Sequence, residues 1–367
     1  MTAISFPPPF KPPEPSTEQS LNIQSLPPEI IGEIGSCLTS KDIRAAAVAA
    51  RQLSQSVLNQ HVIYLAPRKS ITDNDLAILV KNYPNLIHLD LENQVCITND
   101  GLAHLQKLNR LTQLNLSGCK QITGAGLAHL QPLTELEDLN LSNCNISDND
   151  LVYLQPFTKL KELKIDENYE IKGPGLVHLQ HMILLEVLNI SWCDINDESL
   201  FHLRHFLKLV VLDLSRNTDL TGAGLVHLRP LTLIEDLSLN SCDVNDEHLI
   251  HLQHFSELDR LDLTANANLT GAGLAHLQHL PNLNTLILKY WWNNPACNPG
   301  QIALLTQLRY LNLSNCYIRD ENLVDLYPLA NLETLEFSEC RNLTPDGLIL
   351  LQQQLPNCRI FRRFEAR

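Results

Sequence analysis

The chain has 367 residues, of which 44% are hydrophobic and 19% charged, so it carries enough apolar side chains for a large folded core. Its 41 acidic residues outnumber its 27 lysines and arginines, and the formal net charge of -14 excludes nucleic acid as an expected ligand, because a polyanion would be repelled. Residues 1–16 lack the basic and apolar regions of a signal peptide, and no run of 18 apolar residues follows. We therefore expect neither Sec export nor a membrane span.

Residues 1–20 contain six prolines and almost no large aliphatic side chains. Such a segment cannot bury a core, so we predict a disordered leader with polyproline II character. It is a flexible leader, an export signal or a ligand for a proline-reading domain, and the sequence leaves these alternatives open.

A small helical module is predicted over residues 21–60. Pro27 and Pro28 suit the first turn of a helix, and Glu29 favours the positive end of that helix. Further on, Ser40 and Asp42 can cap a second helix.

A repeat of 24 or 25 residues fills most of the remaining chain. Two consecutive copies read LTQLNLSGCKQITGAGLAHLQPLTE and LEDLNLSNCNISDNDLVYLQPFTK. Leucines at positions 1, 4 and 6 have the period of a strand with one buried face, and the later Leu-x-x-Leu-x-x-(Leu/Phe) run has helical spacing. Each copy therefore predicts one strand and one helix.

Eleven copies can be aligned, and because one copy cannot cover its own apolar face, they must stack into an array. They begin at Leu86, Leu111, Leu136, Leu160, Leu185, Leu209, Ile234, Leu258, Leu283, Leu308 and Leu332. The pattern resembles leucine-rich repeats in their cysteine-containing form. The phrases GAGLAHL and GAGLVHL, which begin at Gly124, Gly222 and Gly271, resemble the GALA-type repeats of bacterial effector proteins.

Six of the ten cysteines stand at position 9 of a repeat, where other copies have Asn168, Asn217 or Asn266. A position that accepts either residue indicates a buried small side chain that bonds to loop backbone. We expect no disulfide and no metal site there. The cysteines concerned are Cys119, Cys144, Cys193, Cys242, Cys316 and Cys340.

The segment before the array resembles the F-box. Its opening Leu-Pro-x-Glu-Ile matches the start of that motif, and its next apolar residues follow the same spacing, whereas Ala49 and Leu53 stand where the family has other residues. The resemblance implies docking on a Skp-type adaptor of a cullin-RING ligase. The residues expected to bind the adaptor are Leu26, Pro27, Glu29, Ile30, Ile34, Leu38 and Ile43. A helical hairpin that only caps the array is the alternative.

The predicted fold class is α/β: a leucine-rich-repeat solenoid with a curved parallel sheet inside and helices outside, preceded by the helical F-box-like module. Strands stack about 4.8 Å apart and helices about 10 Å, so the sheet must lie on the inner side of a horseshoe. We expect the array to occupy residues 61–357 and a C-terminal cap residues 358–367, with residues 61–85 as a degenerate first repeat.

The inner face is expected to be acidic and to bind a protein target, because a focused negative field attracts a basic partner. A merely solvated sheet is the alternative. Aromatic residues at strand exits supply candidate anchors, especially where KYWWNNPACNPGQ interrupts the repeat. The expected target-binding residues are Tyr290, Trp292, Tyr310, Trp192, Asp138, Asp213, Asp236 and Asp262. Trp291 stands at position 9, so part of this cluster could instead belong to the core.

No catalytic set is expected, and no cofactor or metal. The histidines that recur at one helix position, such as His202, His227 and His251, are spaced by whole helices of about 10 Å and are too far apart to share a metal ion. No Ser/His/Asp set or phosphate loop stands outside the repeat. The chain therefore lacks the sequence signature of an enzyme.

The sequence, with both resemblances, predicts a substrate-recruiting F-box subunit of an SCF-type ubiquitin ligase. Its expected partners are the Skp-type adaptor and an unidentified, basic protein target, and outside that complex we expect a monomer. Asn-x-Ser sequences in the predicted strands would be glycan acceptors in a secretory lumen and would interfere with the sheet, so a reducing cytoplasm is expected, which would be a host cytoplasm for a bacterial effector. The alternative is a leucine-rich-repeat scaffold or inhibitor without ubiquitin-ligase coupling.

Overall fold

The computed structural model describes residues 64–66, 70–291 and 299–363. The proline-rich leader, the F-box-like segment and the interrupting residue Trp292 lie outside the described residues. The predictions made for them are therefore unaffected by the structure.

In the described part of the chain, thirteen parallel strands form one sheet in strict sequence order, β1 to β13. Strands β2 to β12 each cover positions 3 to 5 of one of the eleven aligned repeats, so the repeat boundaries predicted from the leucines are confirmed. The strands are β1 (Tyr64–Leu65), β2 (His88–Asp90), β3 (Gln113–Asn115), β4 (Asp138–Asn140), β5 (Glu162–Lys164), β6 (Val187–Asn189), β7 (Val211–Asp213), β8 (Asp236–Ser238), β9 (Arg260–Asp262), β10 (Thr285–Ile287), β11 (Tyr310–Asn312), β12 (Thr334–Glu336) and β13 (Arg359–Phe361).

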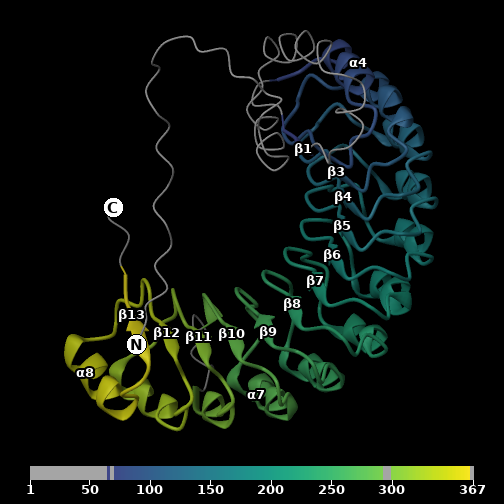
Figure 1. Cartoon of the computed structure of the whole chain (residues 1–367). Coiled ribbons are helices and arrows are strands. Elements are labelled where there is room, and N and C mark those ends of the chain that lie inside the picture. Colours follow the sequence, from purple (N-terminus) through teal and green to yellow (C-terminus); the bar gives the residue numbers. More distant parts are fainter. Residues whose placement is uncertain (1–63, 67–69, 292–298, 364–367) are drawn as a thin grey trace, which may run out of the picture.

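The sheet lines the inside of a curved solenoid and the helical segments lie on its outside (Figure 1). The predicted horseshoe is thus confirmed. Leucines at positions 1, 4 and 6 are buried throughout the array, as Leu111, Leu114 and Leu116 illustrate. They form one continuous core between the sheet and the outer segments.

The outer segments differ from the prediction of one α-helix per repeat. Most are 3₁₀-helices, because the apolar residues recur strictly every third residue. A 3₁₀-helix has three residues per turn and aligns Leu200, Leu203 and Phe206 on its buried side, whereas the same spacing drifts around an α-helix. Longer α-helices occur in the terminal repeats, and α4 buries Leu79 and Val80, which lie three and four residues after Leu76.

The described helical segments follow the strands in alternation. The α-helices are α4 (Asp73–Asn82), α5 (Asn99–Leu102), α6 (Gly124–Leu127), α7 (Gly271–Leu274) and α8 (Pro345–Gln354). The 3₁₀-helices are η2 (Ala103–Lys107), η3 (Ala128–Leu130), η4 (Asp148–Leu154), η5 (Pro174–Leu179), η6 (Asp197–His205), η7 (Ala223–Leu228), η8 (Asp246–His254), η9 (Ala275–His279), η11 (Pro299–Leu304) and η12 (Asp320–Leu326).

The side chain at position 9 ties each repeat to the one before it. Cys144 Sγ donates to the carbonyl of Leu116 at 3.3 Å, and Asn168 Nδ2 donates to the carbonyl of Leu141 at 2.9 Å. Both acceptors are at position 6 of the preceding repeat. Burial raises the pKa of the Cys144 thiol to about 12, so the thiol stays protonated and able to donate.

The same bond recurs at every cysteine of this row, so the predicted structural role of position 9 is confirmed. The pairs are Cys119 with Leu91, Cys193 with Ile165, Cys242 with Leu214, Cys316 with Leu288 and Cys340 with Leu313. The eight described cysteines are all free thiols.

Two members of the row have unexpected side chains. Gln94 occupies position 9 of the first aligned repeat, and its Oε1 accepts from the backbone N of Ile71 at 2.8 Å. Trp291 occupies position 9 of the interrupted repeat, where it is 2% exposed and donates from Nε1 to the carbonyl of Leu269 at 3.0 Å. Trp291 is therefore a core residue.

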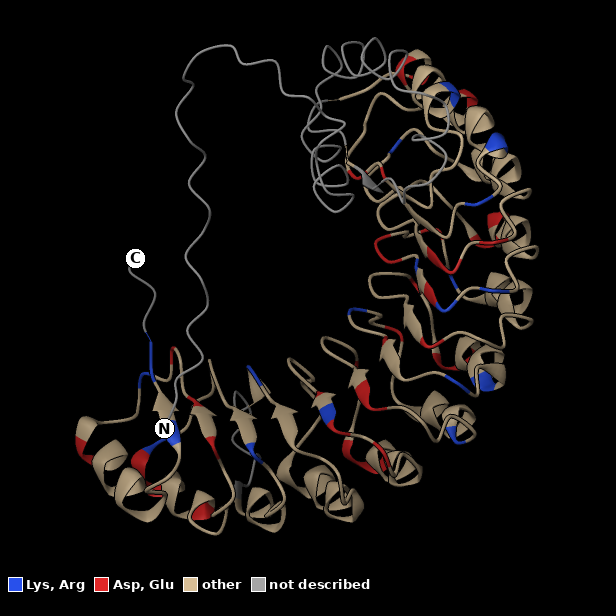
Figure 2. Cartoon of the chain, viewed as in Figure 1, with Lys and Arg blue, Asp and Glu red and all other residues tan. Residues whose placement is uncertain are grey.

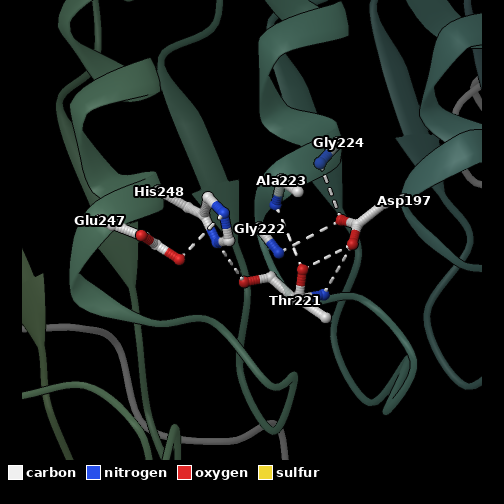
Figure 3. A network of polar contacts seen from close by, with 7 residues as sticks. All are labelled: Asp197, Thr221, Gly222, Ala223, Gly224, Glu247 and His248. Carbon is white, nitrogen blue, oxygen red and sulfur yellow. Dashed lines mark hydrogen bonds and ion pairs between the residues drawn. The ribbon is translucent and has the colours of Figure 1, made fainter.

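The Thr-Gly-Ala-Gly motif at residues 221–224 binds a carboxylate of the preceding repeat (Figure 3). Asp197 accepts hydrogen bonds from the hydroxyl of Thr221 at 2.6 Å and from the backbone N of Gly222 and Gly224 at 3.2 and 2.8 Å. An N-terminal helical turn presents free N–H groups, which the carboxylate satisfies. Asp246 bonds to Thr270 of the next repeat in the same way. In the first Gly-Ala-Gly repeat, the side-chain oxygen of Asn99 takes the place of the carboxylate and accepts from the backbone N of Thr123.

Candidate functional site: a hollow on the concave face

Side chains at positions 3 and 5 of each repeat, the first and last residues of its strand, point away from the core and form the concave surface. In β8, for example, Leu237 is buried and its neighbours Asp236 and Ser238 are half-buried. Figure 2 shows acidic residues on inner strands along much of the array, with basic residues between them. Among the charged side chains of these strands, carboxylates therefore outnumber cations.

Where position 5 is aspartate or asparagine, its side chain also shapes the loop that leaves the strand. Asp213 Oδ1 accepts from the backbone N of Ser215 at 2.9 Å, and Asp262 Oδ1 accepts from the backbone N of Thr264 at the same distance. These are Asx turns, in which a short carboxylate or amide replaces a backbone acceptor. Asp213 and Asp262 thus have a structural role besides the binding role predicted for them.

The residue at position 8 adopts a left-handed backbone conformation in every aligned repeat. Asparagine and glycine accept this conformation most readily, whereas for a bulky side chain it is an outlier. Trp192, with φ 51°, and Tyr290, with φ 59°, are such outliers. The full row is Asn93, Gly118, Asn143, Glu167, Trp192, Arg216, Ser241, Ala265, Tyr290, Asn315 and Glu339.

A shallow hollow of about 490 Å³ lies on the concave face over β7 to β9 and the loops that follow β5 to β8. One tryptophan, five carboxylates and two arginines line it, together with small polar and aliphatic residues. The lining residues are Asp166, Glu167, Ser191, Trp192, Val211, Leu212, Asp213, Ser215, Arg216, Asp236, Ser238, Asn240, Arg260 and Asp262.

Trp192 is the large aromatic surface of this hollow and is 40% exposed. The guanidinium carbon of Arg216 lies 4.5 Å from the centroid of its ring, and Tyr169 meets the ring edge-to-face with centroids 6.1 Å apart. An indole face binds a cation through its quadrupole. The site thus already holds one cation against its aromatic wall.

The carboxylates of the hollow are crowded. Burial raises the pKa of Asp236, and nearby Asp213 and Asp262 raise it further, while Arg260, 3.4 Å away, lowers it. Burial also raises the pKa of Asp166 in spite of the hydrogen bond from the Ser142 hydroxyl. The two arginines therefore do not fully neutralise the carboxylates of the hollow, and an added cation would stabilise their ionised form.

The structure brings four predicted target-binding residues together, namely Trp192, Asp213, Asp236 and Asp262. Asp138 lies apart, in a second concave hollow of about 340 Å³ that it shares with Glu162 and Lys164.

The predicted tyrosines do not line either of these two hollows. Tyr290 is half exposed at position 8 of its repeat. Tyr310 lies on β11, where its hydroxyl accepts from Asn312 Nδ2 at 3.1 Å. Among the described residues, no ring contact joins Tyr290 to Tyr310.

Sequence reasoning missed Tyr169 and did not assign a binding role to Arg216 or Arg260. Arg216 stands at position 8, one repeat after Trp192, so the stacking of equivalent positions could have paired them. Tyr169 comes from a loop whose path the leucine pattern does not specify, and nothing in the repeat pointed to it.

The described part of the chain shows no group of three or more His, Cys, Asp and Glu side chains arranged to hold a metal ion. In the same ranges, no helix has both the length and the apolar character needed to span a membrane. The hollow can bind a partner by charge and by aromatic contact.

Models of the leucine-rich repeat match residues 107–130, 133–154, 181–203 and 307–329. The array consists of leucine-rich repeats. An internalin, InlF, from Listeria monocytogenes str. 4b F2365 is similar in structure over 88% of this chain and 90% of its own, with 21% identity and a TM-score of 0.61.

Two further solved structures resemble the leucine-rich-repeat array. One is TLR13 in a TLR13–ssRNA13 complex, with a TM-score of 0.56 and 20% identity over 85% of this chain and 51% of that one. The other is a TDR receptor, with a TM-score of 0.53 and 18% identity over 85% and 53% of the two chains. At these identities the likeness extends to the fold alone.

Proposed function

We propose that the chain recruits protein targets on the concave face of its leucine-rich-repeat array. The observation that carries this proposal is the hollow in which Trp192 is exposed beside incompletely neutralised carboxylates. Exposed tryptophans are frequent binding anchors, and Trp192 keeps its exposed ring at position 8 although the left-handed conformation there costs a bulky residue on the order of 1 kcal/mol. A basic segment of a target would meet both the indole face and the carboxylates.

Nucleic acid is a poor candidate for this surface. TLR13 has been solved with an RNA, but the hollow described above has five carboxylates against two arginines. A phosphate backbone would be repelled there.

We further propose that the recruited target is delivered to an SCF-type ubiquitin ligase. This part rests on the resemblance of Leu26-Pro27-x-Glu29-Ile30 to the start of an F-box, placed directly before leucine-rich repeats. The Skp-type adaptor would hold this segment while the array holds the target, which raises the effective concentration of the target near the ubiquitin-charged enzyme. The GALA-like phrases support a bacterial effector that acts in a host cytoplasm.

The test of ligase coupling is calorimetric titration of the full chain with a purified Skp-type adaptor. We expect binding at micromolar concentration or tighter, and its loss in an Ile30→Asp/Ile34→Asp double variant. Trp192→Ala, which alters only the concave hollow, should bind the adaptor like the parent chain. If the parent chain shows no binding, the coupling is refuted, and a leucine-rich-repeat scaffold or inhibitor becomes the better description.

A further inference from the structure

The outer surface of the middle repeats carries apolar side chains that have no partner in the core. On the 3₁₀-helix η6 the period of three residues buries Leu200, Leu203 and Phe206. The same period aligns Phe201 and Arg204 on another side, and continues to Leu207 in the turn that follows. Phe201 is 41% exposed and Leu207 57% exposed.

The neighbouring outer segments repeat this arrangement. On the preceding repeat Val177 and Ile183 hold the equivalent places and are 36% and 60% exposed. On the following repeat Val226 is half-buried at the place of Phe201, whereas Thr232 stands at the place of Leu207. The ring of Phe201 meets that of His227 on η7 with centroids 5.5 Å apart, so side chains of adjacent repeats are in contact. Exposed apolar residues that are grouped in this way mark a site of interaction.

Cations lie among these apolar residues. The guanidinium of Arg204 lies 3.6 Å from the centroid of the Phe201 ring. Lys208 is exposed in the turn that follows η6, and Arg229 is exposed on the next repeat. Within the described ranges none of the three forms an ion pair with a carboxylate. Figure 2 shows basic residues on the outer segments of these repeats. In a chain of net charge -14, unpaired cations beside apolar groups are complementary to an acidic partner.

We propose that this outer patch, defined by Val177, Ile183, Phe201, Arg204, Leu207 and Arg229, binds an acidic amphipathic helix of a partner protein. The spacing supports a helix. Outer segments of adjacent repeats lie about 10 Å apart, and residues seven apart on an α-helix are separated by about 10.5 Å. One apolar residue per heptad would therefore meet each successive repeat, and carboxylates beside them would meet Arg204 and Arg229. This site is separate from the concave hollow and acts independently of it.

The experiment is selection of a displayed library of random 18-residue peptides on the immobilised full chain. We expect the selected peptides to have leucine, isoleucine or phenylalanine seven residues apart, together with aspartate and glutamate. A synthetic consensus peptide, measured by fluorescence anisotropy, should bind a Phe201→Ser/Leu207→Ser variant at least about thirtyfold more weakly, the effect of losing anchor residues. Arg204→Gln/Arg229→Gln should bind it more weakly and with less dependence on salt.

Val324→Ser is the matched control, because Val324 is 55% exposed at the equivalent position of η12, outside the patch. It should bind like the parent chain, and so should Trp192→Ala, while circular dichroism verifies that every variant is folded. Peptides without the apolar heptad spacing or without acidic residues would overturn the proposal, as would binding that is insensitive to Phe201 and Leu207. Self-association of the parent chain in sedimentation equilibrium, lost in Leu207→Ser, would overturn it in favour of a second copy of the chain.

Discussion

Position 9 shows how one small side chain can hold two repeats together. A thiol and a carboxamide are interchangeable there because each presents a donor to the carbonyl at position 6 of the preceding repeat. The amide does more, since Asn168 Nδ2 also donates to Ile165 of its own repeat at 2.8 Å. The requirement is a buried donor of limited size, and thiol chemistry is not needed.

We therefore expect Cys144→Asn to fold with a melting temperature close to that of the parent chain. Cys144→Lys should destabilise strongly, because a charge would be placed in a site only 5% exposed. Thermal unfolding followed by circular dichroism compares the two variants. Equal destabilisation by asparagine and lysine would mean that the sulfur itself is required.

The crowded carboxylates make stability depend on pH. The raised pKa of Asp236 means that the native chain binds its proton more tightly than the unfolded chain does. The stabilisation of the native chain by this protonation is present in full below the unfolded pKa of about 3.9. It is lost as the pH rises through the folded pKa of Asp236.

Asp236→Asn, which cannot ionise, should therefore be more stable than the parent chain at pH 7 and lose this advantage at pH 3. Urea unfolding at the two pH values measures the difference. A variant less stable than the parent at pH 7 would show that the ion pair with Arg260 outweighs the crowding.

Single residues were predictable from the sequence where the repeat constrains them. The buried role of position 9 followed from the exchange of cysteine with asparagine, whereas the placement of Trp291 in the core did not. A tryptophan at that position could point into the core or into solvent. It points into the core only if there is space for the indole beneath the neighbouring loop, which the sequence does not show. The contact of the Arg216 guanidinium with the Trp192 ring could not be predicted either, because contacts between repeats depend on side-chain direction.

At the scale of the element, the third residue of the Gly-Ala-Gly phrase is fixed by close packing between repeats. A Cβ on Gly224 would lie 2.5 Å from the carbonyl oxygen of Asp197, whereas a Cβ on the equivalent Gly126 would meet mainly the side chains of Asn99 and Leu102. Backbone cannot move aside as a side chain can.

Gly224→Ala should consequently destabilise the array by roughly 1–3 kcal/mol, the usual cost of overpacking. Gly126→Ala should cost less, because the side chain of Asn99 can shift at the expense of its hydrogen bonds to Thr123, whereas the Asp197 backbone cannot. Urea denaturation of both variants gives the comparison, and an equal or reversed order would contradict the role assigned to the Asp197 backbone.

The elements themselves were largely predictable. Leucine spacing located the repeat that contains each strand from β2 to β12, because alternation with one buried face is a strong signal. The helix type was not predicted from the sequence. The pattern does differ, because α4 buries Val80 four residues after Leu76, whereas η6 has Arg204 four residues after Leu200. The period of three, taken literally, predicts 3₁₀-helices.

At the scale of the whole molecule, curvature follows from the unequal spacing of the strands and the outer helical segments. It gathers side chains from consecutive repeats into one concave surface. The sequence predicted that surface and its acidity, and it named four residues of the hollow. Which aromatic residues face a partner depends on loop conformation. The structure was therefore needed to show that Trp192 and Tyr169 lie at the hollow and that Tyr290 and Tyr310 do not line it.

The central claim is that the hollow around Trp192 binds a protein target. The most direct test places a photoreactive phenylalanine analogue at Asn240, which lines the hollow, and irradiates the full chain in eukaryotic cytosol. Recognition at this site predicts a discrete protein adduct that disappears when Trp192→Ala is added and persists when Val324→Ser is added. No discrete adduct, or one that survives Trp192→Ala undiminished, would contradict it.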